Sequence, residues 1–138
     1  MPDEVRATWL RGFEARVETR GHVIAVDEPV EDGGTDAGVM PTDLLAASIA
    51  SCFCLALAFV ARKRGRELPG LQVAVRRFRA GRELRIERFE IEVRAEVDED
   101  ELEALMEPAR RVCWVSNTLA HGVELSYAYT SVDARTQR

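Results

Sequence analysis

The chain has 138 residues, a formal net charge of −5 and a sequence pI of about 5.2. A chain of this length fits one domain with one hydrophobic core, which we place over residues 1–138. Hydrophobic residues make up 46% and charged residues 31%, a composition that excludes the disordered class. The acidic balance argues against a partner that is nucleic acid or an anionic membrane.

The first third of the chain alternates apolar and polar residues, which predicts β-strands. We expect strands over 5–10, 13–19 and 22–27, joined by tight turns at Arg11-Gly12 and Arg20-Gly21. The next segment, 28–40, holds a proline and three glycines among acidic residues and predicts a loop.

A run without charge from Leu44 to Ala61 is the most distinctive segment. Thr42 is a candidate N-cap, Asp43 suits the positive end of a helix dipole, and Arg62-Lys63-Arg64-Gly65 is typical of a helix end. The run is long enough to span a membrane, but it is rich in small residues and has no second span beside it. We therefore predict the central buried helix of a soluble protein. One layer of strands cannot cover every face of it, so burial against a second copy is expected.

The second half of the chain predicts an antiparallel hairpin followed by helices. We expect strands over 71–80 and 84–97, turning at Gly81, with a bulge near Phe89. A helix over 98–112 contains Pro108, which should kink or divide it.

Three further elements complete the prediction. A short helix over 116–120 has Ser116 as its candidate N-cap, residues 123–130 alternate as a closing strand, and 133–138 read as a frayed tail. The predicted order is β-β-β-α-β-β-α-α-β, an α+β domain with antiparallel pairing and a long central helix.

Three cysteines carry the reactive chemistry that the sequence offers. The N-terminus lacks the basic and apolar regions of a signal peptide, so we expect a cytoplasmic protein with reduced thiols and any disulfide transient. Cys52 and Cys54 point about 200° apart on a helix and cannot share a partner. Cys113, close to a helix start and to Arg110 and Arg111, could form a thiolate. Simple packing is the alternative for each cysteine.

Other kinds of site find no support. There is no C-x-x-C pair and there are only two histidines, so no metal is expected. No G-x-S-x-G elbow is present, and the glycine-rich loop lacks the lysine of a phosphate-binding loop.

Two motifs carry a family resemblance. The segments Pro41-Thr42-Asp43-Leu44-Leu45-Ala46-Ala47 with Ala50-Ser51-Cys52, and Cys113-Trp114-Val115-Ser116-Asn117-Thr118-Leu119, resemble those of the OsmC/Ohr family of thiol-dependent hydroperoxide reductases. The order of elements matches over nearly the whole chain. The resemblance implies an OsmC-like fold and an intertwined homodimer, with central helices packed together and two sites at the subunit interface.

The resemblance also implies roles for the two cysteines. Cys52 would attack the O–O bond of an organic hydroperoxide and become a sulfenic acid, which Cys113 would resolve as an intramolecular disulfide. An external dithiol, a lipoyl group in one branch of the family, would reduce that disulfide. No bound cofactor is implied.

The chain departs from the family at the groups that would hold the thiolate. Thr42 stands where a glutamate is usual, with Asp43 next to it, and no arginine occurs between Arg20 and Arg62. Arg20, or Arg16, is a candidate substitute from a strand end or from the other subunit. Trp114 also replaces the proline that usually follows the second cysteine. These differences indicate a more general OsmC-like branch.

Three hypotheses follow. The first is a Cys-based thiol peroxidase whose apolar helix wall favours organic hydroperoxides over hydrogen peroxide. The second is a homodimeric small-molecule-binding or redox-sensing protein that kept the fold and the thiols. The third is a structural interaction domain in which the charge-free helix is only an interface.

Overall fold

The computed structural model describes residues 3–132, so the predicted frayed tail lies outside the described residues. Within that range five strands, one 3₁₀ turn and three α-helices follow one another. In chain order they are β1 (Arg6–Arg11), β2 (Glu14–Thr19), β3 (His22–Val26), η1 (Val30–Asp32), α1 (Pro41–Lys63), β4 (Gln72–Arg79), β5 (Ile86–Arg94), α2 (Glu99–Val112) and α3 (Trp114–His121). The α+β class and the predicted order are confirmed, except for the last strand.

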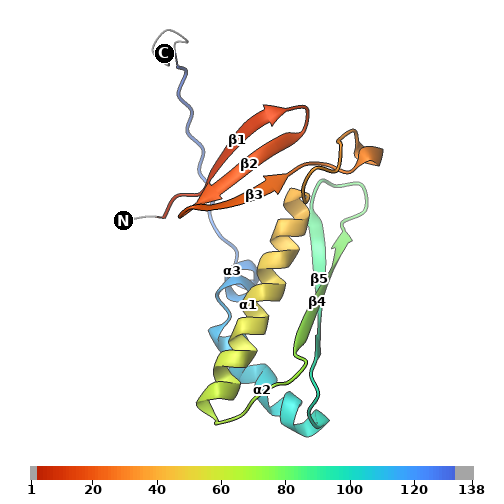
Figure 1. The fold of residues 1–138 in the computed structure, drawn as a ribbon, viewed down its shortest axis with the longest axis vertical. Coiled ribbons are helices and arrows are strands. Elements are labelled where there is room, and N and C mark those ends of the chain that lie inside the picture. The colour runs from red at the N-terminus through yellow and green to blue at the C-terminus, as the bar shows by residue number, and fades with distance from the viewer. Residues whose placement is uncertain (1–2, 133–138) are drawn as a thin grey trace.

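The strands form two separate antiparallel sheets. One has the order β1-β2-β3 and the other is the β4–β5 hairpin. The three-stranded sheet lies across the N-terminal end of α1, whereas the hairpin runs along that helix (Figure 1). The predicted bulge is confirmed close to its expected place, because the register of the hairpin shifts where Phe78 pairs with Arg88 and Arg79 pairs with Ile86. The extra residue is Glu87.

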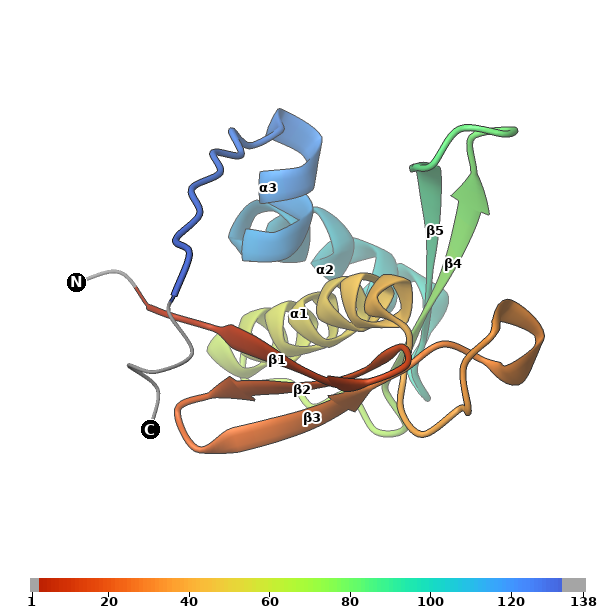
Figure 2. The ribbon, with the colours of Figure 1, turned by 90° about the horizontal axis from the view of Figure 1, so that it is seen from above.

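The core forms around α1. This helix packs against α2, α3 and β4, and Figure 2 shows the two helices and the hairpin along different sides of it. The buried residues of the cluster are Phe53, Ala56, Leu57, Val60, Ala61, Leu105, Ala109 and Cys113. By length and composition α1 is the one described helix that could cross a membrane. Within the single chain, 33% of its most apolar stretch is buried, against α2, α3 and β4.

The sequence predicts that Pro108 kinks or divides its helix, and the structure excludes the division. Helix α2 runs without a break from Glu99 to Val112 with Pro108 inside it. A proline cannot donate to the carbonyl four residues before it, here that of Ala104. The Arg64 guanidinium donates to that carbonyl oxygen instead, at 3.3 Å. A side chain from the end of α1 therefore replaces the missing backbone donor.

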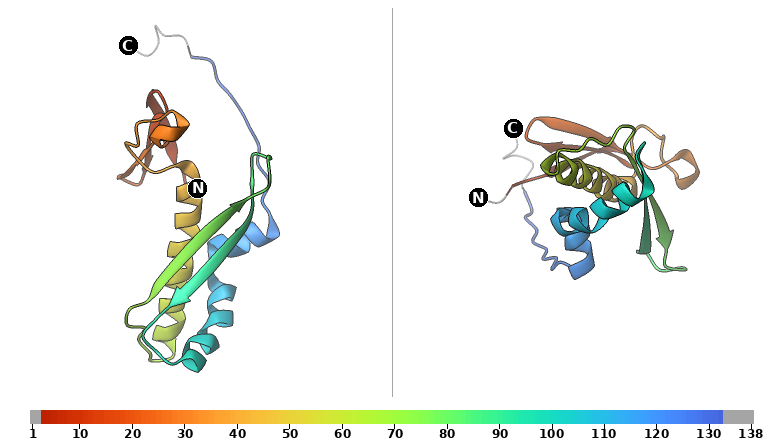
Figure 3. Two further views of the ribbon diagram at one scale, coloured as in Figure 1. Left: turned by 90° about the vertical axis from the view of Figure 1, so that its right-hand side faces the viewer. Right: turned by 90° about the horizontal axis from the view of Figure 1, so that it is seen from below.

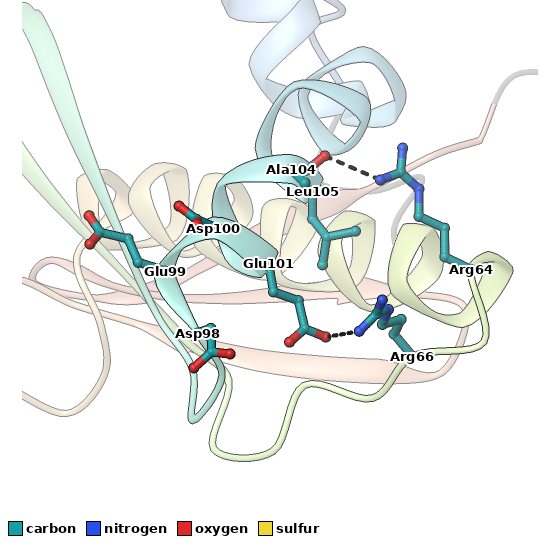
Figure 4. Close-up of a pocket in the computed structure, with 8 residues that line it drawn as sticks. All are labelled: Arg64, Arg66, Asp98, Glu99, Asp100, Glu101, Ala104 and Leu105. Carbon is teal, nitrogen blue, oxygen red and sulfur yellow. Dashed lines mark hydrogen bonds and ion pairs between the residues drawn. The ribbon is translucent and has the colours of Figure 1, made fainter.

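This contact belongs to a charged pocket between the end of α1 and the start of α2 (Figure 4). Arg66 and Glu101 form an ion pair of 2.8 Å beside it. The lining residues are Arg64, Arg66, Asp98, Glu99, Asp100, Glu101, Ala104 and Leu105. Arg64 and Arg66 both bind groups of α2, so these two contacts connect the end of α1 to α2.

The predicted closing strand is wrong for the single chain. Residues 123–132 form no strand and extend away from the helices (Figure 3). Their alternating apolar side chains face solvent, with Tyr127 90% and Tyr129 98% exposed. A strand needs a neighbour that accepts and donates its backbone hydrogen bonds, and no described strand of this chain lies alongside the segment.

The loop between β3 and α1 is organised by one buried carboxylate. Asp27 is 1% exposed and accepts hydrogen bonds from the backbone N–H groups of Glu28, Thr35 and Ala37 and from the Thr35 hydroxyl. The loop also needs close backbone contact, since a Cβ atom at Gly34 would lie 2.0 Å from a carbonyl oxygen. This closed loop fixes where α1 begins.

We predict that Asp27→Ala lowers the melting temperature by about 10 °C, because four donors lose their acceptor. The Ala37 N–H, opposed by burial and helped by the other donors, lowers the pKa of Asp27 from 3.8 to about 2. The carboxylate therefore stabilises the fold above pH 3.8, and this contribution is lost as the pH falls towards 2. Thermal melts at pH 7 and pH 3 test both statements. An equal decrease in melting temperature from pH 7 to pH 3 in wild type and in Asp27→Ala would contradict the role of the Asp27 carboxylate.

Candidate active site at Cys52 and Cys113

Cys52 lies in the middle of α1, at the edge of its buried face. Its side chain is half-buried and packs against the core cluster that contains Phe53 and Cys113. The small residues Ala50 and Ser51 precede it in the sequence. The Ser51 hydroxyl donates a hydrogen bond to the Ala47 carbonyl oxygen at 2.8 Å. Cys54, two positions further on, points to another side of the helix. The three cysteines are free thiols.

Cys113 connects α2 to α3 and is fully buried, with 0% exposure. It ends α2 and is also the N-cap of α3, with extended backbone angles of φ −85° and ψ 102°. Its carbonyl accepts the Asn117 N–H at 3.1 Å, and the Asn117 side chain donates to the Arg111 carbonyl at 3.2 Å. The sharp turn at the cysteine is therefore fixed from both helices.

The prediction that Ser116 is the N-cap of this helix is wrong. Helix α3 begins at Trp114, which makes Cys113 the N-cap and places Ser116 in the first turn, three residues later. An N-cap side chain normally accepts from the backbone N–H groups two and three residues after it. Here that side chain is a thiol, so the first turn of α3 faces a sulfur atom.

The surroundings of Cys113 favour its thiolate. Burial alone would raise the pKa of this thiol. The Ser116 hydroxyl, the backbone N–H groups of Ser116 and Val115, and the Cys52 thiol act in the opposite direction, and the pKa is lowered. The fold thus brings two cysteines that lie 61 positions apart in the sequence (113 − 52) to one hydrophobic cluster.

The structure places Thr42 and Asp43 at the start of α1, away from Cys52. The N-cap is Met40, not Thr42 as predicted, and Pro41 is the first helical residue. Nine residues of helix put Asp43 about 13 Å along the axis from Cys52 and about 180° around it. The side chains of Asp43 and Cys52 therefore do not meet within one chain.

Asp43 instead stabilises the N-terminus of α1. Its carboxylate accepts the Met40 N–H at 3.0 Å and pairs with the Arg77 guanidinium of β4 at 2.7 Å. The Met40 N–H first, and then Arg77, lower the pKa of this carboxyl. The sequence analysis missed this pair, because nothing in the spacing of the two residues indicates that β4 packs against the first turn of α1.

Arg20 lies in the β2–β3 turn with a left-handed backbone, at φ 48°. It is exposed and lines a surface groove made by strands of the first sheet, together with residues such as Glu18 and His22. Within one chain the structure does not bring it to the cysteines. Among residues 3–132 no three His, Cys, Asp or Glu side chains gather to hold a metal ion.

A large apolar surface is left uncovered. On α1, Leu55 is 70% and Phe59 47% exposed, on the side of the helix next to Cys52. The first sheet exposes Trp9 and Phe13, and every residue of β1 is exposed. A three-stranded sheet is stable only when a hydrophobic face is covered, so this sheet requires another surface.

Comparisons with known proteins agree with this architecture. The model of the OsmC-like protein family matches residues 33–128. A putative osmotic stress induced and detoxification response protein from Psychrobacter arcticus is 24% identical, with a TM-score of 0.73 over 83% of this chain and 85% of that one. The Legionella pneumophila organic hydroperoxide resistance protein OsmC is 25% identical, with a TM-score of 0.63 over 86% and 89%.

A third structure carries a ligand. A putative organic hydroperoxide resistance protein from Vibrio cholerae, with captopril bound in one of its active sites, is 25% identical, with a TM-score of 0.60 over 84% and 83% of the two chains. No curated protein matches the chain.

Proposed function

The chain belongs to the OsmC-like protein family, and from that premise we propose that it is a homodimeric thiol peroxidase that reduces organic hydroperoxides. The observation that carries the proposal is the packing of Cys52 against the buried cluster that contains Cys113, a thiol whose pKa is lowered. Two similar structures are organic hydroperoxide resistance proteins by name. An attacking thiol and a resolving thiol within reach are what such chemistry needs.

The reaction would take place in two steps. The Cys52 thiolate attacks the terminal oxygen of R–O–O–H, the O–O bond breaks, and the alkoxide leaves as the alcohol after protonation. The Cys113 thiolate then attacks the sulfur of the Cys52 sulfenic acid, and its hydroxyl leaves as water. The products are an alcohol, water and a Cys52–Cys113 disulfide, which an external dithiol, lipoyl-type or other, reduces.

The apolar side of α1 next to Cys52 supports a preference for organic peroxides. Phe59 lies within about 20° of Cys52 around the helix axis, and it is 47% exposed in the single chain. The hydrocarbon group of an organic peroxide would be removed from water on this surface, which favours its binding. Hydrogen peroxide has no group to place on this surface.

A second copy of the chain is part of the proposal. It would meet α1 at Leu55, with Cys52 left at the open edge of the interface, and it would cover the apolar side chains of the first sheet and offer a neighbour to residues 123–132. It could also supply the supporting groups that one chain does not bring to Cys52. Thr42 is exposed at the start of α1, and Arg20 is exposed in its turn. We expect the protein in the cytoplasm, without a nucleic acid or membrane partner.

Peroxide consumption tests this function. With dithiothreitol as the reductant we expect turnover of tert-butyl hydroperoxide, at a rate per mole of peroxide about tenfold or more above that of hydrogen peroxide. A dithiol is used, because it can reduce the disulfide that ends the proposed cycle in two successive exchanges. Absence of turnover with both peroxides would contradict the proposed peroxidase function. Equal rates with tert-butyl hydroperoxide and hydrogen peroxide would contradict the preference for organic peroxides.

One observation favours the second candidate function, a binding or redox-sensing homodimer. Among the described residues no hydrogen bond or ion pair joins Cys52 to an arginine, and Arg77 is paired with Asp43. A thiol without a cation beside it reacts slowly. For this function we expect the disulfide to form with peroxide but turnover to stay close to the rate without protein.

A further inference from the structure

The two sulfurs of the candidate site differ in how an external thiol can reach them. Cys113 is fully buried in the cluster that contains Leu57, Leu105 and Ala109. Cys52 is half-buried and lies at the edge of the exposed face of α1. A thiol that attacks a disulfide must approach one sulfur along the S–S axis, so access decides which sulfur is attacked.

The two sulfurs also differ in what surrounds them. Cys113 is the N-cap of an eight-residue helix, and the first-turn N–H groups of that helix lack partners within it. Ser116 lies in the same turn, and its hydroxyl donates to the Cys113 carbonyl oxygen at 3.4 Å, which keeps the hydroxyl next to this residue. Negative charge on this sulfur would be stabilised by these donors. Nothing comparable surrounds Cys52, which lies in the middle of α1, where backbone N–H groups are bonded within the helix.

We propose that the Cys52–Cys113 disulfide is reduced in one direction only: an external thiolate attacks the Cys52 sulfur, and Cys113 leaves as a thiolate that Ser116 stabilises from the first turn of α3. The inference rests on the proposed function and adds the direction of its reductive step. Ser116 acts through Cys113 and is a positioning residue.

The step balances as a thiol–disulfide exchange. The thiolate R–S⁻ forms a bond to the Cys52 sulfur, the Cys52–Cys113 bond breaks, and its electron pair stays on the Cys113 sulfur. The second thiol of the dithiol then attacks the mixed disulfide at the reductant's own sulfur. This releases the Cys52 thiolate and a cyclic disulfide, and two electrons have passed from the dithiol to the protein.

The direction is tested by trapping the mixed disulfide. Cys54→Ser protein is oxidised with diamide, so that the disulfide forms even if the peroxide chemistry fails, and is then treated with limiting glutathione, a monothiol. Alkylation and peptide mapping locate the glutathione. Glutathione on Cys52 with alkylated Cys113 is expected. Glutathione on Cys113, or failure of diamide to join the two cysteines, would overturn the proposal. Failure of peroxide alone to form the disulfide would count against the proposed function only.

The role of Ser116 has its own test. We expect Ser116→Ala to slow the reduction of the diamide-formed disulfide by dithiothreitol about threefold to tenfold, since a more basic thiol leaves more slowly. In the Cys52→Ser background the same change should shift the thiolate absorbance of Cys113 to higher pH. Ser116→Thr should restore both values.

Thr118→Ala is the matched control, because it removes a hydroxyl from the same helix that bonds to the Trp114 carbonyl at 2.8 Å. An equal effect of Ser116→Ala and Thr118→Ala, or no effect of Ser116→Ala, would overturn the assignment of Ser116.

Discussion

Replacing Cys52 by serine is expected to lower the rate of tert-butyl hydroperoxide consumption on the order of a thousandfold or more, to the level of dithiothreitol alone. A serine hydroxyl is not ionised at neutral pH and does not form the sulfenic acid on which the cycle depends. The substitution is nearly isosteric at a half-buried position, so the fold should persist. The assay is the loss of peroxide with time under saturating dithiothreitol.

Cys54→Ser is the matched control for this experiment. It makes the same chemical change two residues further along α1, at a cysteine that is also half-buried but points to another side of the helix. Turnover close to wild type is expected. Equal losses in the two variants, or unchanged turnover in Cys52→Ser, would contradict the role of Cys52 as the attacking thiol.

The second large effect is expected at the surface that we assign to the second copy. Leu55→Glu should raise the dissociation constant of the homodimer about a hundredfold or more, because it places a carboxylate in an apolar interface. Leu55 is 70% exposed in the single chain, so the change should cost the monomer little. Light scattering after gel filtration over a range of concentrations measures the mass, which should fall towards that of one 15.4 kDa chain.

Leu84→Glu is the control for the interface. Leu84 lies between β4 and β5 and is 96% exposed, so the same substitution there tests a leucine outside α1. We expect its mass to equal that of wild type. A monomeric wild type, or equal masses for Leu55→Glu and Leu84→Glu, would contradict the interface.

Local patterns predicted most of the fold. The alternation in the first strands, the charge-free run of α1 and the hairpin that turns at Gly81 each depend on neighbours in the sequence, and their elements lie where expected. The errors have causes outside the local sequence. Pro108 does not divide α2, because Arg64 from another helix supplies a donor to the Ala104 carbonyl.

The closing strand failed for a related reason. Its alternating pattern describes which side chains prefer burial, but a strand also needs a backbone partner, which is not within the described part of this chain. Residues 123–132 therefore have the alternating pattern of a strand but no partner strand within the described part of this chain.

The two cysteines of the candidate site could be predicted from the sequence, but the residues that surround them could not. The motifs indicated Cys52 and Cys113, but the packing of Cys52 against the cluster that contains Cys113 depends on how α1 lies against α2 and α3. The position of Cys113 as an N-cap could not be inferred, since cysteine is not among the residues preferred there and Ser116, three residues later, is. The Asp43–Arg77 pair had no signal in the sequence, because it joins a helix to a later strand.

The most direct test of the account is a peptide map of wild-type protein after one equivalent of tert-butyl hydroperoxide without a reductant. We expect one new species, in which peptides containing Cys52 and Cys113 are joined within a single chain while Cys54 is alkylated. Three free cysteines, or a disulfide through Cys54, would contradict it.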